Sequence, residues 1–590
     1  MMKAIKKVVS ISAIIIMLLA GKTYAESISD SLVMVEKSKD FEAWESLSKY
    51  DKENVIQPDY YNINIKDSIK RSVYNDLLLV GSNLESQYDL RSKMQIKVKN
   101  QQKVGACWAF SYTSMLETTL ANKYNLTNIE YSPMHIDYMA AKIYNRTVGK
   151  SGTRNMSLAY ATGGYGPVLE KDFPFESVYD EKNNRVTNYY LTDISNVNLN
   201  QKVRARVTDS TVFAKICKKY DTNSITYTDA SQTPNEYSKE EVEIIRQLIK
   251  NQIKENGAVS ATFYSDMGIT ANDEIVSSNG YYNSENKAFY CDDGDVSVNH
   301  AVTIIGWDDN YKRENFSKEH RPLNDGAYIV LNSWGETFGD NGYFYVSYDD
   351  SCIEKEVSAV NDIVNYEDEL TENIYQYDEL GVNMGYSLKD KSKNSLKTIE
   401  AANVFSRKDL NKKEYLTEVG IGLISTEGIE IYVNPKDDNL ENANLLVATA
   451  TGANALESGY HSLKLASPVE LTGEKFVIKV KYINEEYAIL PVEMNLKDNN
   501  QAFFANAYDT ATSNEGESYT LFYGTTWTDF TKIFKNTNAC IKGFTTTAEK
   551  PAIVNVEKIE LNKTNDKVEV GKNIALVANI TPENATNKNI

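Results

Sequence analysis

Hydrophobic positions in the first half of the chain recur with the spacing of helices. Across 107–124 they lie three or four residues apart and predict a helix with one apolar face. Ser132 and Pro133 predict the start of a second helix, because serine caps a first turn and proline fits its first position. A third helix is predicted from Ser238, where Glu241 completes a capping box.

Later segments change to short apolar runs that suit buried strands. These runs span 259–263, 298–305 and 327–331. From about residue 365 to 545, apolar and polar positions alternate, most clearly at 476–482, which predicts a sandwich of strands. Helices that precede strands, followed by an all-β region, place the chain in the α+β class.

The length and the charge of the chain limit its class. A chain of 590 residues exceeds what one hydrophobic core organises, so roughly two to four domains are expected. Acidic residues outnumber basic ones by 82 to 63, and the sequence contains no basic run, zinc-like Cys/His spacing or glycine-rich phosphate loop. These observations argue against nucleic acid as a partner.

The N-terminus has the pattern of an export signal. Lys3, Lys6 and Lys7 precede an apolar run over 8–20, and small residues around Ala25 form a cleavage site. The run is shorter than a bilayer-spanning helix needs, although a membrane anchor or a buried helix is the alternative. We therefore predict a signal peptide at 1–25, no membrane span after its removal, and a product that is secreted or bound to the cell surface.

Cysteine is sparse for an exported chain. The five cysteines are Cys107, Cys217, Cys291, Cys352 and Cys540. An odd number leaves one thiol free if the other four pair, and the sequence does not say whether they pair. Cys107 is the candidate for the free thiol because of the residues that surround it.

Four short strings contain the groups of one active site. They are Asn100-Gln101, Gly105-Ala106-Cys107-Trp108-Ala109-Phe110, Asn299-His300-Ala301-Val302 and Asn332-Ser333-Trp334-Gly335. A thiol, an imidazole and two side-chain amides can attack a carbonyl group and stabilise the resulting oxyanion. Of the four histidines, only His300 lies in a strand-like apolar run. We expect His135 to pack in a helix, His320 to lie solvated in a loop, and His461 to belong to the β region.

The strings occur in the order typical of the papain family of cysteine peptidases, and residues 84–350 resemble that family. The resemblance implies a helical lobe and a β-rich lobe with the active site between them. Cys107 would be the nucleophile, His300 the general base and acid, and Asn332 the residue that orients His300. Trp334 would shield this pair from water. Gln101, with the backbone N–H of Cys107, would form the oxyanion hole.

Two features depart from the papain pattern. Val104 stands where the family commonly has a disulfide-forming cysteine. The chain therefore lacks a cross-link of the family, but it lacks no catalytic group. His300 follows Cys107 by 193 residues, whereas the papain pattern has about 130 to 150. We expect the excess to form surface loops, hosted by 180–235 and 310–325.

The resemblance also suggests how the chain binds substrate and how it is kept inactive. Gly152 resembles a glycine of the family's substrate-binding wall, although a plain turn glycine is an equal alternative. Residues 26–85 correspond to a propeptide that blocks the cleft, or else to a simple spacer. The protease domain would then span 86–360.

The remainder resembles two β domains of bacterial cell surfaces. Residues 361–545 resemble the lectin-like domain of clostridial papain-type surface proteases, including those that process surface-layer protein, most strongly at 525–529 and 539–542. Residues 551–590 resemble a truncated bacterial immunoglobulin-like domain, because a full sandwich needs on the order of 80 to 100 residues. The lectin-like relatives suggest a structural calcium, and the domain need not bind sugar.

The expected function is that of an exported cysteine endopeptidase, made as a zymogen, that hydrolyses protein substrates at the cell surface. The resemblance suggests surface-layer or extracellular matrix proteins as substrates, and cell wall or surface-layer components as partners. The chemistry needs no cofactor and no metal. Two alternatives stay open: a wall- or carbohydrate-binding adhesin with an inactive protease scaffold, and an amidase or transpeptidase that acts on peptidoglycan.

Overall fold

The computed structural model describes most of the chain. It covers residues 32–63, 65, 69, 84–175, 179–180, 185–186, 194–269, 275–366, 371, 373–390, 392–425, 427–496, 510–522, 526–547, 557–563, 567 and 578–581. The predicted signal peptide at 1–25 and most of the predicted immunoglobulin-like segment at 551–590 lie outside the described residues.

The first two predicted helices are confirmed. Helix α6 spans Cys107–Tyr124. Helix α7 spans Pro133–Ile143, and the side chain of Ser132 before it accepts a hydrogen bond from the backbone N–H of His135. The cap satisfies an amide that the first helical turn leaves unpaired, which is why the helix begins there.

The third predicted helix is also confirmed, and helix α8 (Arg154–Thr162) of the same unit has no counterpart among the predictions. Helix α9 spans Lys239–Glu255 and begins with the capping box of Ser238 and Glu241. The nine residues of α8 place Asn, Ser and Thr among Met, Leu, Ala and Tyr, so hydrophobic spacing does not single it out.

The predicted strands of the first unit, residues 84–366, are confirmed as neighbouring antiparallel strands of one sheet. They are β9 (Val259–Phe263), β14 (His300–Asp308) and β15 (Ala327–Leu331). Helix α6 packs on this sheet, where Ser111 Oγ donates a hydrogen bond of 2.7 Å to the carbonyl oxygen of Val302 in β14. The contact holds the N-terminal half of α6 against the start of β14.

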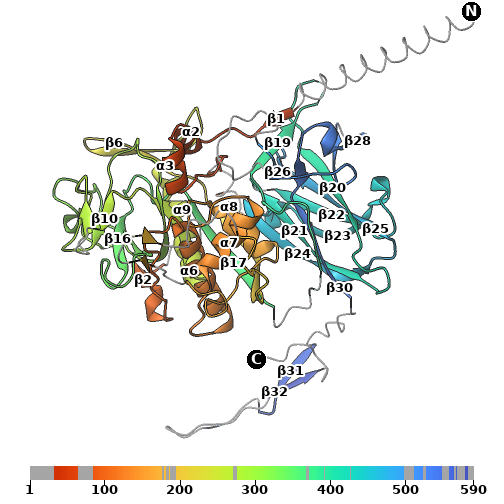
Figure 1. Cartoon of the computed structure of the whole chain (residues 1–590), viewed down its shortest axis with the longest axis horizontal. Coiled ribbons are helices and arrows are strands. Elements are labelled where there is room, and N and C mark those ends of the chain that lie inside the picture. Colours follow the sequence, from red (N-terminus) through yellow and green to blue (C-terminus); the bar gives the residue numbers. More distant parts are fainter. Residues whose placement is uncertain are drawn as a thin grey trace, which may run out of the picture.

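Further strands extend this unit. They are β2 (Gln87–Asp89), β3 (Tyr179–Asp180), β4 (Arg185–Val186), β5 (Ala205–Val212), β6 (Cys217–Asp221), β7 (Ser224–Thr228), β8 (Glu236–Tyr237), β10 (Met267–Ile269), β11 (Ile275–Ser277), β12 (Tyr282–Asn283), β13 (Ala288–Phe289), β16 (Tyr343–Ser347) and β17 (Val357–Asn365). In Figure 1 the helices of this unit lie together on its sheet, to the left of the second unit.

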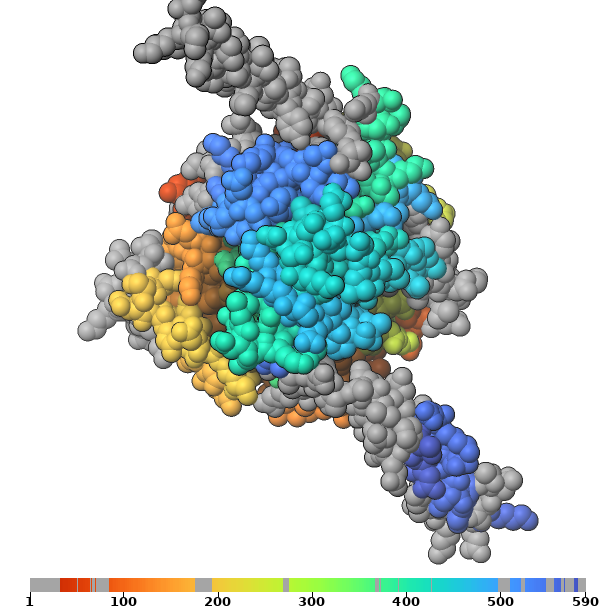
Figure 2. Space-filling view, turned by 90° about the vertical axis from the view of Figure 1, so that its right-hand side faces the viewer, coloured from red at the N-terminus to blue at the C-terminus, as the bar shows by residue number. Residues whose placement is uncertain are grey.

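The second unit, residues 373–547, consists of strands and short 3-10 turns. Its strands are β18 (Asn373–Tyr375), β19 (Met384–Leu388), β20 (Thr398–Ser406), β21 (Tyr415–Leu423), β22 (Gly428–Asn434), β23 (Leu445–Ala450), β24 (Gly459–Glu470), β25 (Lys475–Ile483), β26 (Leu490–Met494), β27 (Ser518–Phe522), β28 (Thr526–Asp529), β29 (Thr537–Ala539) and β30 (Ile541–Thr546). The alternating positions 476, 478, 480 and 482 are all fully buried in β25. The α+β class with a following all-β region is confirmed, and Figure 2 looks onto this second unit.

One sheet runs through both units. Its order is β12-β13-β16-β15-β14-β9-β17-β5-β24-β21-β30-β18, with β2 paired to β14. The link is β5, which pairs with β17 of the first unit and with β24 of the second through Asp209↔His461 and its neighbours. The two units therefore meet along continuous backbone hydrogen bonds; we call the region around β5, β24 and β21 the junction.

The place of β5 corrects the expectation that residues 180–235 form a surface loop. Ala205–Val212 is a buried strand in the middle of the sheet. Its sequence appears polar, but its polar side chains have partners inside the molecule. Thr208 donates a hydrogen bond to Asp362, and the hydroxyl of Ser210 accepts one from the backbone N–H of Tyr460. These partners are distant in sequence, so the pattern gave no sign that the polar side chains are satisfied inside the molecule.

The N-terminal segment, residues 32–63, lies across both units (Figure 1). It contains β1 (Leu32–Met34), α2 (Lys39–Glu45) and α3 (Lys49–Asn54). Strand β1 adds to the second unit by pairing with β19. Phe41 and Trp44 of α2 are buried in the main core, and Asp40 lies 3.2 Å from Lys355 of the first unit.

The end of the described chain is a separate hairpin. Strands β31 (Lys558–Leu561) and β32 (Ala578–Thr581) pair with each other. Within the described part of the chain, no helix has both the length and the apolar character that a membrane crossing requires.

Candidate active site

Cys107 lies at the first position of α6. The cap residue before it is Ala106, which offers no side-chain hydrogen bond to the first turn. Unpaired amides at a helix N-terminus favour an anion such as a thiolate. The backbone amides of Ala301 and Trp108 also act on the sulfur and lower its pKa, although burial outweighs them. The sulfur therefore lies beside the residue that follows His300.

His300 is the first residue of β14, and Asn332 directly follows β15. The ring Nε2 of His300 lies 2.8 Å from Oδ1 of Asn332. Asn332 Oδ1 also accepts a hydrogen bond of 2.8 Å from the backbone N–H of Ser333, which identifies this atom as the oxygen. Because an oxygen only accepts, Nε2 of His300 carries the proton, and Nδ1 is free to accept one.

Aromatic rings cover the His300–Asn332 bond. The Trp334 ring lies over the imidazole with the ring centroids 5.1 Å apart. Phe338 meets Trp334 edge to face at the same centroid distance. These rings keep water from the hydrogen bond, which strengthens it in the less polar surroundings. The structure thus places Trp334 beside His300.

Gln101 is buried next to the same loop. Its Oε1 accepts a hydrogen bond of 2.5 Å from Ser333 Oγ, and its backbone N–H donates to the Ser333 carbonyl at 2.8 Å. Its Nε2 donates to the carbonyl of Val104 at 2.7 Å. An amide nitrogen has two protons, so one remains to stabilise an oxyanion. Ser333 thus holds the Gln101 amide in its orientation, a contact that the sequence does not reveal.

The missing disulfide at Val104 is replaced by packing. Val104 is almost completely buried in a small apolar cluster with Ala106, Phe110 and Met134. This cluster holds the loop between Gln101 and Cys107 in the way that a cross-link would. The departure at Val104 therefore leaves the neighbouring side chains in place.

Burial keeps the two ionisable groups neutral in this form of the chain. It raises the pKa of the Cys107 thiol to about 11, and it lowers the pKa of the His300 imidazole to about 4. Between these values both groups are uncharged. Transfer of the thiol proton to the ring creates a charge pair without changing the net charge of the cleft.

Gly152 lies two residues before α8, against the indole of Trp108. A Cβ atom at this position would lie 2.4 Å from the Trp108 ring, so only glycine fits. Its carbonyl oxygen accepts a hydrogen bond of 3.2 Å from the backbone N–H of Gln57, and the N–H of Ser151 donates to the Glu53 carbonyl at 2.9 Å. The N-terminal segment thus bonds to the backbone of Ser151 and Gly152 through the end of α3 and the residues that follow it.

The remaining histidines make structural contacts. His135 is fully buried and contacts the Tyr160 hydroxyl and the Leu199 carbonyl, as expected of a packed residue. His461 lies in β24 at the junction, 3.3 Å from Asp209. His320 corrects an expectation: it is half-buried beside Tyr281 and bonds Asp292 at 2.8 Å instead of being solvated. An aromatic partner far along the chain is not visible in a polar sequence run.

In the part of the chain that the structure describes, the cysteines and the acidic residues form neither a disulfide nor a metal centre. All five cysteines are free thiols. Within the described ranges, no three His, Cys, Asp or Glu side chains are grouped so that they could hold a metal ion. The groups around Cys107 are those that nucleophilic attack by a thiol requires.

Two family matches cover most of the chain. Residues 84–361 match the papain family cysteine protease, and residues 374–545 match the lectin like domain. No curated protein matches this chain.

Two solved structures are similar over the whole of their own length. The cysteine protease and lectin-like domains of Cwp84, a surface layer associated protein of Clostridium difficile, share 22% identity over 88% of this chain and 99% of theirs, with a TM-score of 0.64. The clostridial cysteine protease Cwp84 after propeptide cleavage shares 25% identity over 79% of this chain and 100% of its own, with a TM-score of 0.60. Residues 84–361, in the first unit, thus form a papain-family cysteine protease domain, which is followed by a lectin-like domain, the second unit.

Proposed function

We propose that Cys107, His300, Asn332 and Gln101 are the catalytic residues of this peptidase. The proposal rests on the hydrogen bond from His300 Nε2 to Asn332 Oδ1, because it leaves Nδ1 as the base for the thiol. A scaffold that has lost catalysis has no need to keep this tautomer or to shield it with Trp334. The arrangement therefore favours a working peptidase over an adhesin with an inactive scaffold.

The mechanism begins with the thiol proton, which passes from Cys107 to His300 Nδ1 while the sulfur attacks the carbonyl carbon of the substrate. The carbonyl oxygen becomes negative and accepts hydrogen bonds from Gln101 Nε2 and the Cys107 backbone N–H. The C–N bond then breaks, and His300 returns its proton to the leaving amine. Water, activated by His300, hydrolyses the thioester and restores the thiol.

We also propose that residues 26–85 act as a propeptide. The described part of this region hydrogen-bonds to Ser151 and Gly152, the wall where we place the backbone of the substrate. A peptide substrate and the N-terminal segment would compete for the same backbone groups. Removal of the segment would open the cleft and let water reach Cys107, which lowers the cost of forming the charge pair.

The same proposal assigns the whole chain to successive parts. These are a signal peptide at 1–25, the propeptide at 26–85, the protease domain at 86–360, the lectin-like domain at 361–545 and a truncated immunoglobulin-like domain at 551–590. The calcium ion that the resemblance suggests for the lectin-like domain finds no acidic cluster among the described residues. No step of the proposal depends on calcium.

We place the enzyme outside the cell, at the cell surface, where surface-layer or extracellular matrix proteins are its substrates. The export pattern at 1–25 supports this location. The likeness to Cwp84, described as a surface layer associated protein, supports the class of substrate.

Hydrolysis of an unstructured protein by the secreted chain, after removal of residues 26–85, tests the function. We expect cleavage by the wild type and by Cys217→Ala, a matched thiol control, and none by Cys107→Ala. Parallel incubation with peptidoglycan fragments tests the amidase alternative, and a glycan array tests the adhesin alternative. Cleavage of wall fragments without cleavage of protein would contradict the proposal, as would glycan binding by a chain that hydrolyses nothing.

A further inference from the structure

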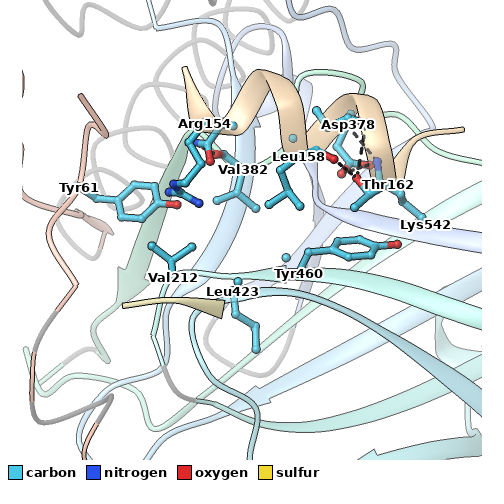
Figure 3. A pocket seen from close by; sticks show the side chains of 15 residues that line it. Tyr61, Arg154, Leu158, Thr162, Val212, Asp378, Val382, Leu423, Tyr460 and Lys542 are labelled. Atoms are coloured by element: carbon cyan, nitrogen blue, oxygen red, sulfur yellow. Dashed lines mark hydrogen bonds and ion pairs between the residues drawn. The ribbon is translucent and has the colours of Figure 1, made fainter. Parts of the chain in front are cut away.

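A small cavity lies where the protease domain, the lectin-like domain and the N-terminal segment meet (Figure 3). Its volume is about 30 Å³, enough for one or two water molecules. Its lining includes Tyr61 of the N-terminal segment, Arg154 and Leu158 of α8, Val212 of β5, Leu423 of β21 and Tyr460 of β24. Each of the three parts of the chain therefore supplies a wall.

Arg154 is the charged group of this cavity, and the N-terminal segment supplies its partner. Arg154 Nη2 lies 2.5 Å from Asp59 Oδ2, with the two side chains 10% and 3% exposed. The Nε and Nη1 atoms of Arg154 are buried and have no hydrogen-bond partner among the residues that the structure describes. Figure 3 shows the Tyr61 ring with its hydroxyl directed toward the guanidinium. The guanidinium thus has more donors than Asp59 and Tyr61 use.

Removal of the N-terminal segment takes away both Asp59 and Tyr61. Burial opposes the charge of Arg154, but Asp59, Tyr61 and Glu356 outweigh it and raise the pKa of the guanidinium. Glu356 is already bound to Lys215 at 2.8 Å, so it is not a free replacement. A largely buried cation without a counter-ion is unfavourable, and the mature enzyme would present Arg154 ready for another carboxylate.

The cavity lies close along the chain to Gly152, where we place the backbone of the substrate, because Arg154 lines it. Gln57 donates its N–H to the carbonyl of Gly152. Two residues further along each of these segments, Asp59 forms an ion pair with Arg154. A peptide that leaves the wall at Gly152 therefore reaches the cavity within a few residues. The far wall belongs to the lectin-like domain, through Leu423 and Tyr460.

We propose that the mature enzyme uses this cavity as an exosite for its protein substrate, namely for a segment in which an acidic residue precedes an aromatic residue by two positions. The N-terminal segment, with Asp59 and Tyr61, shows the chemistry that fits. The acidic side chain binds the planar fork of Arg154, and the aromatic ring packs on Leu158 and Val212. The inference rests on the proposed peptidase function and adds a recognition step outside the catalytic residues.

A substrate with an appended segment tests the exosite. An unstructured protein with one cleavage site is compared with the same protein joined through a flexible Gly/Ser linker to Pro58–Ile63, which excludes the residues bound to the Gly152 wall. We expect the appended segment to lower KM about tenfold at unchanged kcat, because it raises the local concentration of the cleavage site. Appended segments with Asp59→Asn or Tyr61→Ala should lose this gain.

Variants of the enzyme complete the test. Arg154→Gln should give the same KM for the plain substrate and for the substrate with the appended segment. Lys413→Gln, which removes a charge from an exposed side chain, should keep the difference between the two KM values. The substituted segments are tested on wild-type enzyme, so the result does not depend on the folding of Arg154→Gln. An appended segment that raises KM, or one that works equally well without Asp59, would overturn the exosite. Hydrolysis of the plain substrate, and its loss in Cys107→Ala, reports separately on the peptidase function.

Discussion

The catalytic cleft and the junction hold chain segments together by different interactions, which are neutral hydrogen bonds in the cleft and a buried ion pair at the junction. In the cleft, the side chains that position one another are neutral: His300 bonds Asn332, and Gln101 bonds Ser333. At the junction, Arg206 of β5 lies 2.8 Å from Glu418 of β21, with side-chain exposures of 0% and 5%. The guanidinium of Arg206 also lies 3.9 Å from the centroid of the Phe544 ring.

The difference follows from what each region must do. A neutral thiol and a neutral imidazole can exchange a proton without bringing a new net charge into the cleft. A buried ion pair is costly to separate, so it fixes the lectin-like domain against the protease domain in one arrangement. The cleft can therefore change its charge distribution during a reaction, while the junction keeps the wall of the cleft in place.

The largest effect is expected in the cleft, at Cys107. Cys107→Ala removes the nucleophile and should lower kcat/KM at least ~10⁴-fold. The thermal unfolding midpoint should change little, because no ion pair is lost. Peptide hydrolysis and a thermal melt measure the two quantities. Comparable activity in this variant would contradict the assignment of the nucleophile.

The next effect is expected at the junction. Arg206→Met leaves Glu418 buried without its partner and should cost about 3–5 kcal/mol of unfolding free energy. Urea denaturation checks this value. The double variant Arg206→Met with Glu418→Gln serves as the control, and it should recover part of the loss. If Arg206→Met is as stable as the wild type, the buried ion pair does not stabilise the junction, and the proposed difference between the two regions is wrong.

Gln101→Ala tests whether neutral amides perform the electrostatic work in the cleft. Loss of one oxyanion donor should lower kcat/KM about 10²–10³-fold, mainly through kcat. Gln102→Ala, a change at the exposed neighbouring residue, provides the matched control and should retain activity. Equal losses in both variants would indicate damage to the loop instead of a missing donor.

The smallest effect is expected at the pair of His461 and Asp209, where the junction has a titratable group. Burial lowers the pKa of His461, but the Asp209 carboxylate outweighs it and the net pKa is raised. The pair therefore stabilises the fold fully below pH 6.5, the usual pKa of histidine, and this contribution is lost as pH rises through the raised value.

Asp209→Asn should consequently cost about 1 kcal/mol at pH 5.5, a value that allows for the partial exposure of Asp209. The cost should be smaller at pH 9, because His461 loses its charge as the pH rises through its raised pKa. Urea denaturation at the two pH values measures it. Glu470→Gln, a change further along β24, should show no such dependence, and a cost that grows with pH would contradict the sign of the shift.

Local sequence was sufficient for the parts of the cleft and insufficient for the junction. Cys107, His300 and Asn332 each stand at the end of a helix or strand that its own residues predict, and folding brings these ends together. Strand β5 was missed because its polar side chains find partners in β17 and β24. The pairing of Arg154 with Asp59 was equally hidden, because neither residue has a distinctive neighbour in the sequence.

Covalent labelling of the thiols by an epoxide, read by intact mass and peptide mapping, tests the central claim most directly. Burial raises the pKa of Cys217 and Cys291 to about 12 and that of Cys352 to about 11, and it raises the pKa of Cys540 further. These four thiols should stay unlabelled. We predict one adduct on Cys107 after removal of residues 26–85, and a much slower reaction while the N-terminal segment covers the cleft. Labelling of Cys107 at the same rate in both forms, or of the other cysteines in its place, would contradict the account.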